Sequence, residues 1–309
     1  MADIVISEFM DQSAVDGLAD EFDVLYDPNL VDRADDLAAA VADARALIVR
    51  NRTQVSGALL AAARALQVVG RLGVGLDNID LEVCKQRSIA VHPATGANDA
   101  AVAEYVIATA MILMRDAYAA GPQVIAGDWP RQRCMGREIG GKVLGLIGFG
   151  GIARETAQRA RALGMSVMAH DPFVAETDPA WKGVERSELN ELMANADVVS
   201  LHLPLTDGTR GLLDAQMIAR MKKGAVLINT ARGGIVDEDV VVESLCAGHL
   251  AGAALDVFGT EPVKAAAGGR FAGVSNLVLT PHIAGVTQES NVRVSAVTAE
   301  NVRKALSKK

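Results

Sequence analysis

Cysteine is scarce in this chain of 309 residues, and its three copies lie far apart. Cys84, Cys134 and Cys246 form no C-x-x-C pair, so the sequence excludes a zinc site built on paired cysteines and a disulfide-rich scaffold. We expect three structural thiols in a reducing cytoplasm, and no metal site.

Long hydrophobic runs are also missing. The longest, from Val102 to Met114, is interrupted by Glu104 and is shorter than the roughly 20 residues of a membrane span. The start of the chain lacks the basic segment of a secretory signal peptide. These absences predict a soluble, cytoplasmic protein that binds no membrane.

Positive charge is in deficit, with 30 Lys and Arg against 38 Asp and Glu and a net charge of −8. Because phosphate backbones attract basic surfaces, the balance argues against nucleic-acid binding. If such a protein acts on an anionic substrate, its arginines must gather locally.

Short β-branched segments alternate with Ala- and Leu-rich helical segments, which is typical of βαβ units and parallel sheets. The length suits two domains. In the first block we expect strands at Asp3–Ile6, Val24–Tyr26, Ala46–Val49, Val68–Gly70 and Ile89–Val91, and helices at Ser13–Asp20, Leu37–Ala42, Gly57–Ala63 and Leu81–Gln86. In the second we expect strands at Val143–Ile147, Ser166–Ala169, Val198–Leu201, Ala225–Asn229, Gly252–Leu255 and Leu277–Leu279.

Two longer helices complete the pattern. Asp99–Arg115 is apolar on nearly every face, which predicts a buried helix, either crossing between domains or lying in a subunit interface. Gln288–Leu306 is the last helix of the chain.

A glycine-rich turn follows the strand Val143–Ile147 and opens a helix predicted at Ala153–Leu163. The G-x-G-x-x-A turn, Gly148 to Ala153, has the strand before it and the helix after it that a dinucleotide-binding turn requires. Asp171 ends the next strand, about 20 residues further on, where an acid accepts hydrogen bonds from the adenosine ribose. A carboxylate there repels a 2′-phosphate, so the pattern favours NAD over NADP.

Three chemically useful residues follow successive strands of this second block. Arg232 comes after Ala225–Asn229, Glu261 after Gly252–Leu255, and His282 after Leu277–Leu279. Because ligands of open α/β sheets bind at the carboxyl ends of the strands, these side chains are candidates for one active site. Arginine can grip a carboxylate with two parallel hydrogen bonds.

These motifs, in this order, resemble those of the D-isomer-specific 2-hydroxyacid dehydrogenases over nearly the whole chain. The matching segments are Gly73–Asp80, the glycine turn with Asp171, Leu201–Thr206, and the segments around Arg232, Glu261 and His282. One departure is Ala153, where glycine is commoner; alanine is also tolerated there.

The resemblance implies two Rossmann-like parallel-sheet α/β domains, one flavodoxin-like and one dinucleotide-binding, with the active-site cleft between them. Residues 1–97 and 286–309 would form the substrate-binding lid, and residues 98–285 the NAD-binding domain. It also implies a homodimer built through the NAD-binding domain.

The family's roles transfer to matching positions. His282 would exchange the proton at the substrate oxygen, Glu261 would stabilise the protonated imidazole, and Arg232 would hold the substrate carboxylate. The implied NAD-binding set is Gly148, Gly150, Gly151, Ile152, Ala153, Asp171, Leu203, Pro204, Thr230, Ala231, Arg232, Asp256, His282 and Gly285. The implied substrate-binding set is Arg50, Arg71, Val74, Gly75, Arg131 and Arg232.

Arginine placement bears on the substrate. Arg50, Arg71 and Arg131 fall where phosphoglycerate dehydrogenases place arginines for the far anion, although each could also be a solvated surface charge. The resemblance to the (S)-3-sulfolactate dehydrogenases is strongest in Gly148–Arg154, Met168–Val174 and Thr280–Asn291. We therefore expect (S)-3-sulfolactate and 3-sulfopyruvate as substrates, with 3-phosphoglycerate or hydroxypyruvate and glyoxylate as alternatives. A different class, an NAD-sensing corepressor-like binding protein, also shares the fold.

Overall fold

The computed structural model describes residues 2–115 and 117–307 of the chain. The chain separates into two compact units. Unit 1 contains Met1–Asn98 and Val286–Lys309, and unit 2 contains Asp99–Gly285. The first boundary lies one residue from the predicted one, and residues 1 and 308–309 of the predicted first domain fall outside the described part.

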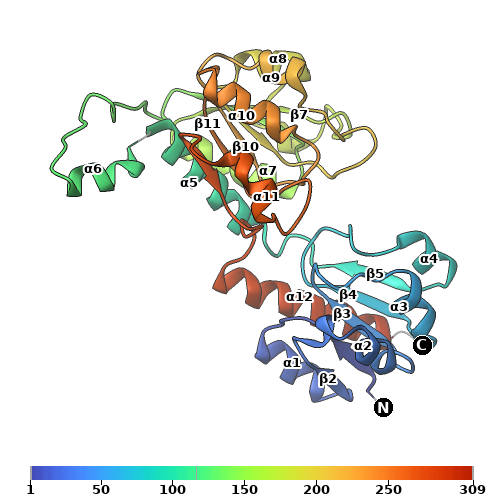
Figure 1. Ribbon diagram of the computed structural model, residues 1–309. Helices are drawn as coiled ribbons and strands as arrows, with labels where there is room; N and C mark the ends of the chain where they lie inside the picture. The colour runs from blue at the N-terminus through green and yellow to red at the C-terminus, as the bar shows by residue number, and fades with distance from the viewer. Residues whose placement is uncertain (1, 116, 308–309) are drawn as a thin grey trace. The chain divides into compact units, whose positions relative to one another are not determined.

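Within the described residues, unit 1 contains a five-stranded parallel sheet with the order β2-β1-β3-β4-β5 (Figure 1). Its strands are β1 (Ile4–Ile6), β2 (Val24–Tyr26), β3 (Ala46–Val49), β4 (Val68–Arg71) and β5 (Ala90–Pro93). Its α-helices are α1 (Gln12–Ala19), α2 (Ala34–Ala40), α3 (Gly57–Ala62), α4 (Leu81–Gln86) and α12 (Gln288–Ser307). The strand order reverses between β1 and β3, and ligands of open α/β sheets bind at such a switch point.

Helices cover both faces of this sheet, which is why its strands are almost wholly apolar. Successive side chains of a strand point to opposite faces. Ile4 and Ile48 therefore join one core with α1 and α12, whereas Val5 and Leu47 join another with α2, α3 and α4. The last helix of the chain thus belongs to the core of unit 1.

Unit 2, as far as it is described, contains a seven-stranded parallel sheet with the order β12-β11-β10-β9-β6-β7-β8. Its strands are β6 (Val143–Ile147), β7 (Ser166–His170), β8 (Glu185–Arg186), β9 (Val198–Leu201), β10 (Ala225–Asn229), β11 (Leu250–Leu255) and β12 (Leu277–Leu279). Its α-helices are α5 (Asp99–Arg115), α6 (Gly121–Ile125), α7 (Gly151–Ala162), α8 (Leu189–Asn195), α9 (Ala215–Ala219), α10 (Glu238–Cys246) and α11 (Ala265–Gly268). The switch point lies between β6 and β9, as in dinucleotide-binding folds.

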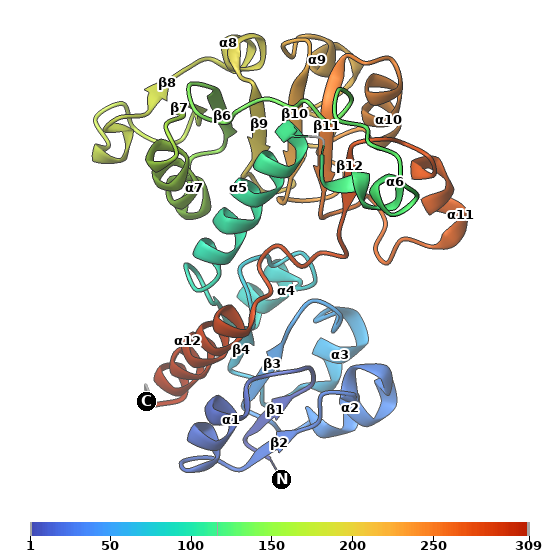
Figure 2. The same cartoon turned by 90° about the vertical axis from the view of Figure 1, so that its left-hand side faces the viewer.

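Both faces of this second sheet are covered as well. On one face α5 packs against α7 (Figure 2), and together with β10 and β11 they enclose a core that contains Val106, Leu113 and Leu146. On the other face α8, α9 and α10 contribute Leu192, Ile218 and Val241. The prediction that α5 is buried is confirmed: nine of its residues are buried, and it packs against α7, β10 and β11 within unit 2.

Several short elements were not predicted. The two-residue strand β8 and the helices α6, α9 and α11, of five residues or fewer, are too short for an apolar period to stand out; the longer helices α8 and α10 were missed as well. The helix predicted from Leu37 begins at Ala34, with Asp35 and Asp36 in its first turn, where acidic side chains favour the helix dipole. The helix predicted from Ala153 begins at Gly151, immediately after the glycine turn.

The segment that contains α6 extends away from the sheet of unit 2 (Figure 1). Several of its large apolar side chains are exposed. They include Tyr118, Ile125, Trp129 and Met135, which are 69–89% exposed. We call residues 117–137 the arm. Among helices of the described residues, none is both long enough and apolar enough to cross a membrane.

Candidate active site

The glycine turn after β6 is shaped by close backbone packing. Gly148 has a φ of +89°, in the left-handed region that side chains disfavour. A Cβ at this position would lie 2.3 Å from the carbonyl oxygen of His202. The turn after β6 therefore packs directly against the chain leaving β9, at the switch point of the sheet.

Asp171 contacts the same turn from the end of β7. Its carboxylate oxygens accept hydrogen bonds from the backbone N–H groups of Phe149 (2.8 Å) and Phe173 (2.9 Å). The ring of Phe149 in turn stacks on Trp181, with ring centroids 4.6 Å apart. The acid at the predicted ribose position thus also fixes the glycine turn.

Two observations show that the predicted NAD-binding residues fit a bound dinucleotide. A Cβ at Gly150 would meet no atom within 4 Å, so open space lies beside the first turn of α7, where backbone N–H groups favour a phosphate. The hydroxyl of Thr230, at the end of β10, is buried and finds no hydrogen-bond partner among the described residues. A buried polar atom of this kind costs about 1–3 kcal/mol unless it is satisfied.

The turn that carries Arg232 is held by a buried amide. Asn229 accepts a hydrogen bond from Ala231 N–H and donates one to the Arg232 carbonyl, both at 3.0 Å. A Cβ at Gly233 would lie 1.8 Å from the Phe258 carbonyl oxygen, so only glycine fits there. The loops after β10 and β11 are therefore in direct contact, which places Arg232 close to the loop of Glu261.

Glu261 and His282 form a hydrogen-bonded pair. The distance from His282 Nδ1 to Glu261 Oε2 is 2.7 Å. Glu261 also accepts the N–H of Phe258 at 2.9 Å through its other oxygen. An ionised carboxylate only accepts, so Nδ1 carries the proton and Nε2 is left for exchange with a substrate.

The charge of Glu261 is stabilised by its surroundings. Burial by itself raises the pKa of the Glu261 carboxyl. The hydrogen bonds from His282 and Phe258, together with the positive charges of His282 and Arg232, outweigh that effect and hold the pKa below its ordinary value. The carboxylate therefore remains ionised beside the imidazole, and its interaction with Arg232 links all three predicted catalytic residues.

A buried network, which the sequence did not reveal, supports the loop of His282. Asp256 is 1% exposed, and its carboxylate accepts hydrogen bonds from Thr280 Oγ1 (2.6 Å), Ile283 N–H and Ala284 N–H (both 2.8 Å). The Tyr105 hydroxyl lies 2.6 Å from Thr280 Oγ1. Since Thr280 donates its proton to Asp256, Tyr105 is the donor to Thr280.

The same network allows an unfavourable backbone conformation at His282. Its φ is +57°, which costs a residue with a side chain about 1–3 kcal/mol. The His282 N–H is directed to the carbonyls of Asp256 (2.8 Å) and Thr280 (3.0 Å). The position of the imidazole is thus set by the loop and not by its own conformational preference.

Other predicted residues lie elsewhere. Arg50 follows β3 and Arg71 ends β4, both in unit 1, and Val74 and Gly75 lie in the loop after β4. Arg131 belongs to unit 2 and is exposed, and it lies in the arm. The remaining predicted cofactor residues Ile152, Ala153, Leu203, Pro204, Ala231 and Gly285 are in unit 2.

Residues 2–115 and 117–307 contain no group of three or more His, Cys, Asp or Glu side chains that could hold a metal ion.

Comparison with known proteins confirms the family resemblance seen in the sequence. Residues 107–284 match the family model for the D-isomer specific 2-hydroxyacid dehydrogenase NAD-binding domain. Over 307 residues the chain is 56% identical to an (S)-sulfolactate dehydrogenase of Chromohalobacter salexigens, and the match covers 99% of each chain.

More distant relatives share the same plan. The chain is 38% identical over 303 residues to a D-3-phosphoglycerate dehydrogenase of Mycobacterium bovis; the match covers 98% of this chain but only 56% of the relative. A solved D-lactate dehydrogenase from Aquifex aeolicus, complexed with NAD and lactic acid, has a TM-score of 0.83 at 27% identity and covers 98% of this chain and 95% of its own.

Proposed function

Because the chain belongs to the D-isomer-specific 2-hydroxyacid dehydrogenase family, we propose that it interconverts a small anionic 2-hydroxy acid and its 2-keto acid. The proposed pair is (S)-3-sulfolactate and 3-sulfopyruvate. NAD is the cofactor of the family domain that the chain contains, and it supplies or accepts the hydride when bound.

The observation that carries this proposal is the 2.7 Å hydrogen bond between His282 and Glu261, with the charge of Arg232 acting on the same carboxylate. A histidine hydrogen-bonded to an ionised carboxylate can act as a general acid and base toward a substrate oxygen. An arginine next to that pair offers a fork of donors for a substrate carboxylate.

Each of these residues then has a distinct task. Arg232 binds the substrate carboxylate and fixes the orientation of C2. His282, through Nε2, gives a proton to the substrate oxygen on reduction and takes it back on oxidation. Glu261 stabilises the protonated imidazole, and Asp256 holds the loop on which His282 lies.

For the cofactor, we propose that the glycine turn and the first turn of α7 bind the pyrophosphate, and that Asp171 binds the adenosine ribose. Thr230 and Ala231 would line the cofactor. The Thr230 hydroxyl, which has no partner among the described residues, would form a hydrogen bond to it. We also propose that Asp256 contacts the nicotinamide carboxamide, because its three hydrogen bonds to residues 280–284 leave about one acceptor site on the carboxylate.

The anionic tail of the substrate is the part that distinguishes sulfolactate from simpler acids. We propose Arg50, Arg71 and Arg131 for it, with the backbone of Val74 and Gly75 binding the carboxylate. Support comes from the 56% identical sulfolactate dehydrogenase, which the chain matches over its full length. 3-Phosphoglycerate is the second candidate, supported by the 38% identical phosphoglycerate dehydrogenase.

A substrate screen tests the proposal directly. NADH oxidation is measured with 3-sulfopyruvate, 3-phosphohydroxypyruvate, hydroxypyruvate and glyoxylate. We expect the highest kcat/KM with 3-sulfopyruvate. A higher value with the phosphorylated acid would make the protein a phosphoglycerate dehydrogenase, and no turnover of any keto acid would favour the corepressor-like class.

Arginine variants test the tail site. Arg50→Ala and Arg131→Ala should each lower kcat/KM for 3-sulfopyruvate at least tenfold, since a hydrogen bond to a charged group contributes about 1.5–3 kcal/mol. The loss with glyoxylate, which has no tail, should be much smaller. Equal losses with both acids would mean that these arginines are structural and that the substrate is an untailed acid.

We also propose a cytoplasmic homodimer. The exposed apolar side chains of the arm, such as Ile125 and Trp129, are the surface that a second copy would cover. Cys84, Cys134 and Cys246 are all free thiols, which suits a reducing compartment. Light scattering during gel filtration should give twice the chain mass, and a monomer would contradict the proposal.

A further inference from the structure

A carboxylate is buried at the switch point of unit 1. Glu8 follows β1 and is 4% exposed, next to the loop Arg50–Thr53 that follows β3. An acid is unexpected here, because the proposed function assigns Arg50 to an anionic substrate tail. Burying a carboxylate without partners is costly, so its contacts should show what it does.

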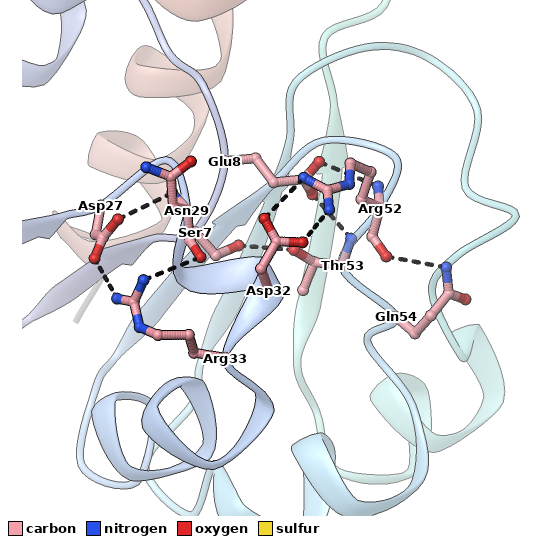
Figure 3. Close-up of polar contacts among 9 residues, drawn as sticks. All are labelled: Ser7, Glu8, Asp27, Asn29, Asp32, Arg33, Arg52, Thr53 and Gln54. Atoms are coloured by element: carbon pink, nitrogen blue, oxygen red, sulfur yellow. Dashed lines mark hydrogen bonds and ion pairs between the residues drawn. The ribbon is translucent and has the colours of Figure 1, made fainter. Parts of the chain in front are cut away.

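All three hydrogen bonds that the Glu8 carboxylate accepts among the described residues come from the backbone of that loop. Oε1 accepts the N–H groups of Arg50 (2.9 Å) and Thr53 (3.0 Å), and Oε2 accepts the N–H of Arg52 (3.1 Å). Figure 3 shows Glu8 reaching Arg52 and Thr53, with the Arg52 guanidinium turned to Asp32. Convergent N–H groups of this kind form an anion-binding concavity, and here the protein's own carboxylate fills it.

Other buried contacts hold the loop from a second direction. The amide of Asn78 donates to the carbonyls of Arg50 (3.2 Å) and Thr53 (2.7 Å). The hydroxyl of Thr53 lies 2.9 Å from that of Ser7, and both residues are buried (Figure 3). The backbone on both sides of the Arg50 side chain is therefore fixed before any ligand binds.

The Arg50 side chain is held as well: its hydrogen bond and its ring contact are with neutral groups, and the charge of Glu8 acts on it without a hydrogen bond between the two side chains. Its guanidinium lies over the ring of Phe9, 5.8 Å from the centroid, and donates to the Asn291 amide oxygen at 2.5 Å. Arg52, by contrast, forms an ion pair with Asp32. Of these two arginines, Arg50 is thus the one whose guanidinium contacts no carboxylate directly among the described residues, so it can still donate to an anion.

We propose that Glu8 is a positioning residue for the substrate tail: its buried carboxylate locks the loop Arg50–Thr53 so that the Arg50 guanidinium is presented to the sulfonate. The inference rests on the proposed role of Arg50. Glu8 occupies the backbone N–H groups, which leaves the side chain of Arg50 as the anion contact of this loop.

The variant Glu8→Gln tests this, because an amide NH₂ cannot accept the backbone N–H of Arg52, which Oε2 now accepts, and it removes the negative charge from the loop. We expect KM for 3-sulfopyruvate to rise at least tenfold, with kcat within about threefold of the unchanged protein. For glyoxylate, kcat/KM should change by less than about twofold. The matched control is Asp11→Asn. The carboxylate of Asp11 also accepts a backbone N–H in unit 1, that of Ser13, and its replacement should change the kinetics of neither substrate.

A double-mutant cycle separates positioning from general damage. If Glu8 acts through Arg50, Glu8→Gln should cost no more than about twofold in an Arg50→Ala background. A full additional tenfold loss there, or equal losses for both substrates, would overturn the inference. If Glu8→Gln does not fold, Glu8→Asp should raise KM for 3-sulfopyruvate by a smaller factor and again leave glyoxylate almost unaffected. A change of the same size for both acids would also overturn the inference.

The two proposals fail in different ways. If Arg50→Ala is selective for the tailed acid and the Glu8 variants are not, the positioning role alone is wrong. If Arg50→Ala itself does not discriminate, the tail site is wrong and the role of Glu8 falls with it.

Discussion

Replacing Glu261 by glutamine should displace the pH profile of the reaction without abolishing it. Glu261 accepts a hydrogen bond from His282 Nδ1 at 2.7 Å, and its carboxylate is kept ionised by its neighbours. A neutral amide at the same place cannot stabilise the protonated imidazole that reduction requires. The pH above which reduction declines should therefore move downward.

The size of that displacement follows from the contact. Hydrogen bonds to charged groups contribute about 1.5–3 kcal/mol. Because the side chains of His282 and Glu261 are 40% and 32% exposed, solvent weakens the pair, and we take the lower end. About 1.4 kcal/mol corresponds to roughly one pH unit.

The assay is kcat/KM for keto-acid reduction by NADH between about pH 5 and pH 10. Glu238→Gln is the matched control. Glu238 also accepts a backbone N–H from this loop, that of Gly259 at 2.7 Å, whereas the hydrogen bond of the imidazole goes to Glu261. The profile of Glu238→Gln should not move. An unchanged midpoint in Glu261→Gln, or one displaced upward, would refute the partnership of Glu261 and His282.

Three further predictions concern the cofactor, the chemistry and the stability. If Asp171 binds the adenosine ribose, NADH should exceed NADPH by at least ~100-fold in kcat/KM, and equal use would reject that role. His282→Ala and Arg232→Ala should each lower kcat/KM by roughly two to four orders of magnitude with little change in NAD affinity measured by fluorescence titration; near-normal turnover would remove either residue from the mechanism. Burial lowers the pKa of His202 from 6.5 to about 3, so the unfolded chain binds a proton that the folded one does not, and stability falls as the pH drops below 6.5. Between pH 6.5 and about pH 4.5, the free energy of unfolding in urea should fall by about 2–3 kcal/mol less in His202→Gln than in the unchanged protein, and parallel pH curves would contradict this.

Much of unit 2 could be predicted because its signals are local. Gly148, Gly150 and the strand before them are adjacent in the chain, and a strand followed by a glycine turn and a helix has few alternatives. Residues that end parallel strands meet at one sheet edge, which is why Arg232, Glu261 and His282 could be assigned to one site. The pairing of Glu261 with His282 was implied by the family resemblance, and their 2.7 Å contact agrees with it.

The tertiary structure decided which residues far apart in the chain contact each other. Tyr105 reaches Thr280 across 175 positions, and Glu8 reaches the loop of Arg50 across 42. No local pattern marks such residues, because their role arises from which strands become neighbours in the sheet. The exposed position of Arg131 on the arm is likewise a property of the folded chain. The sequence alone thus determined the strands, the glycine turn and the reactive residues that end each strand, whereas packing between distant segments decided what holds those residues in place.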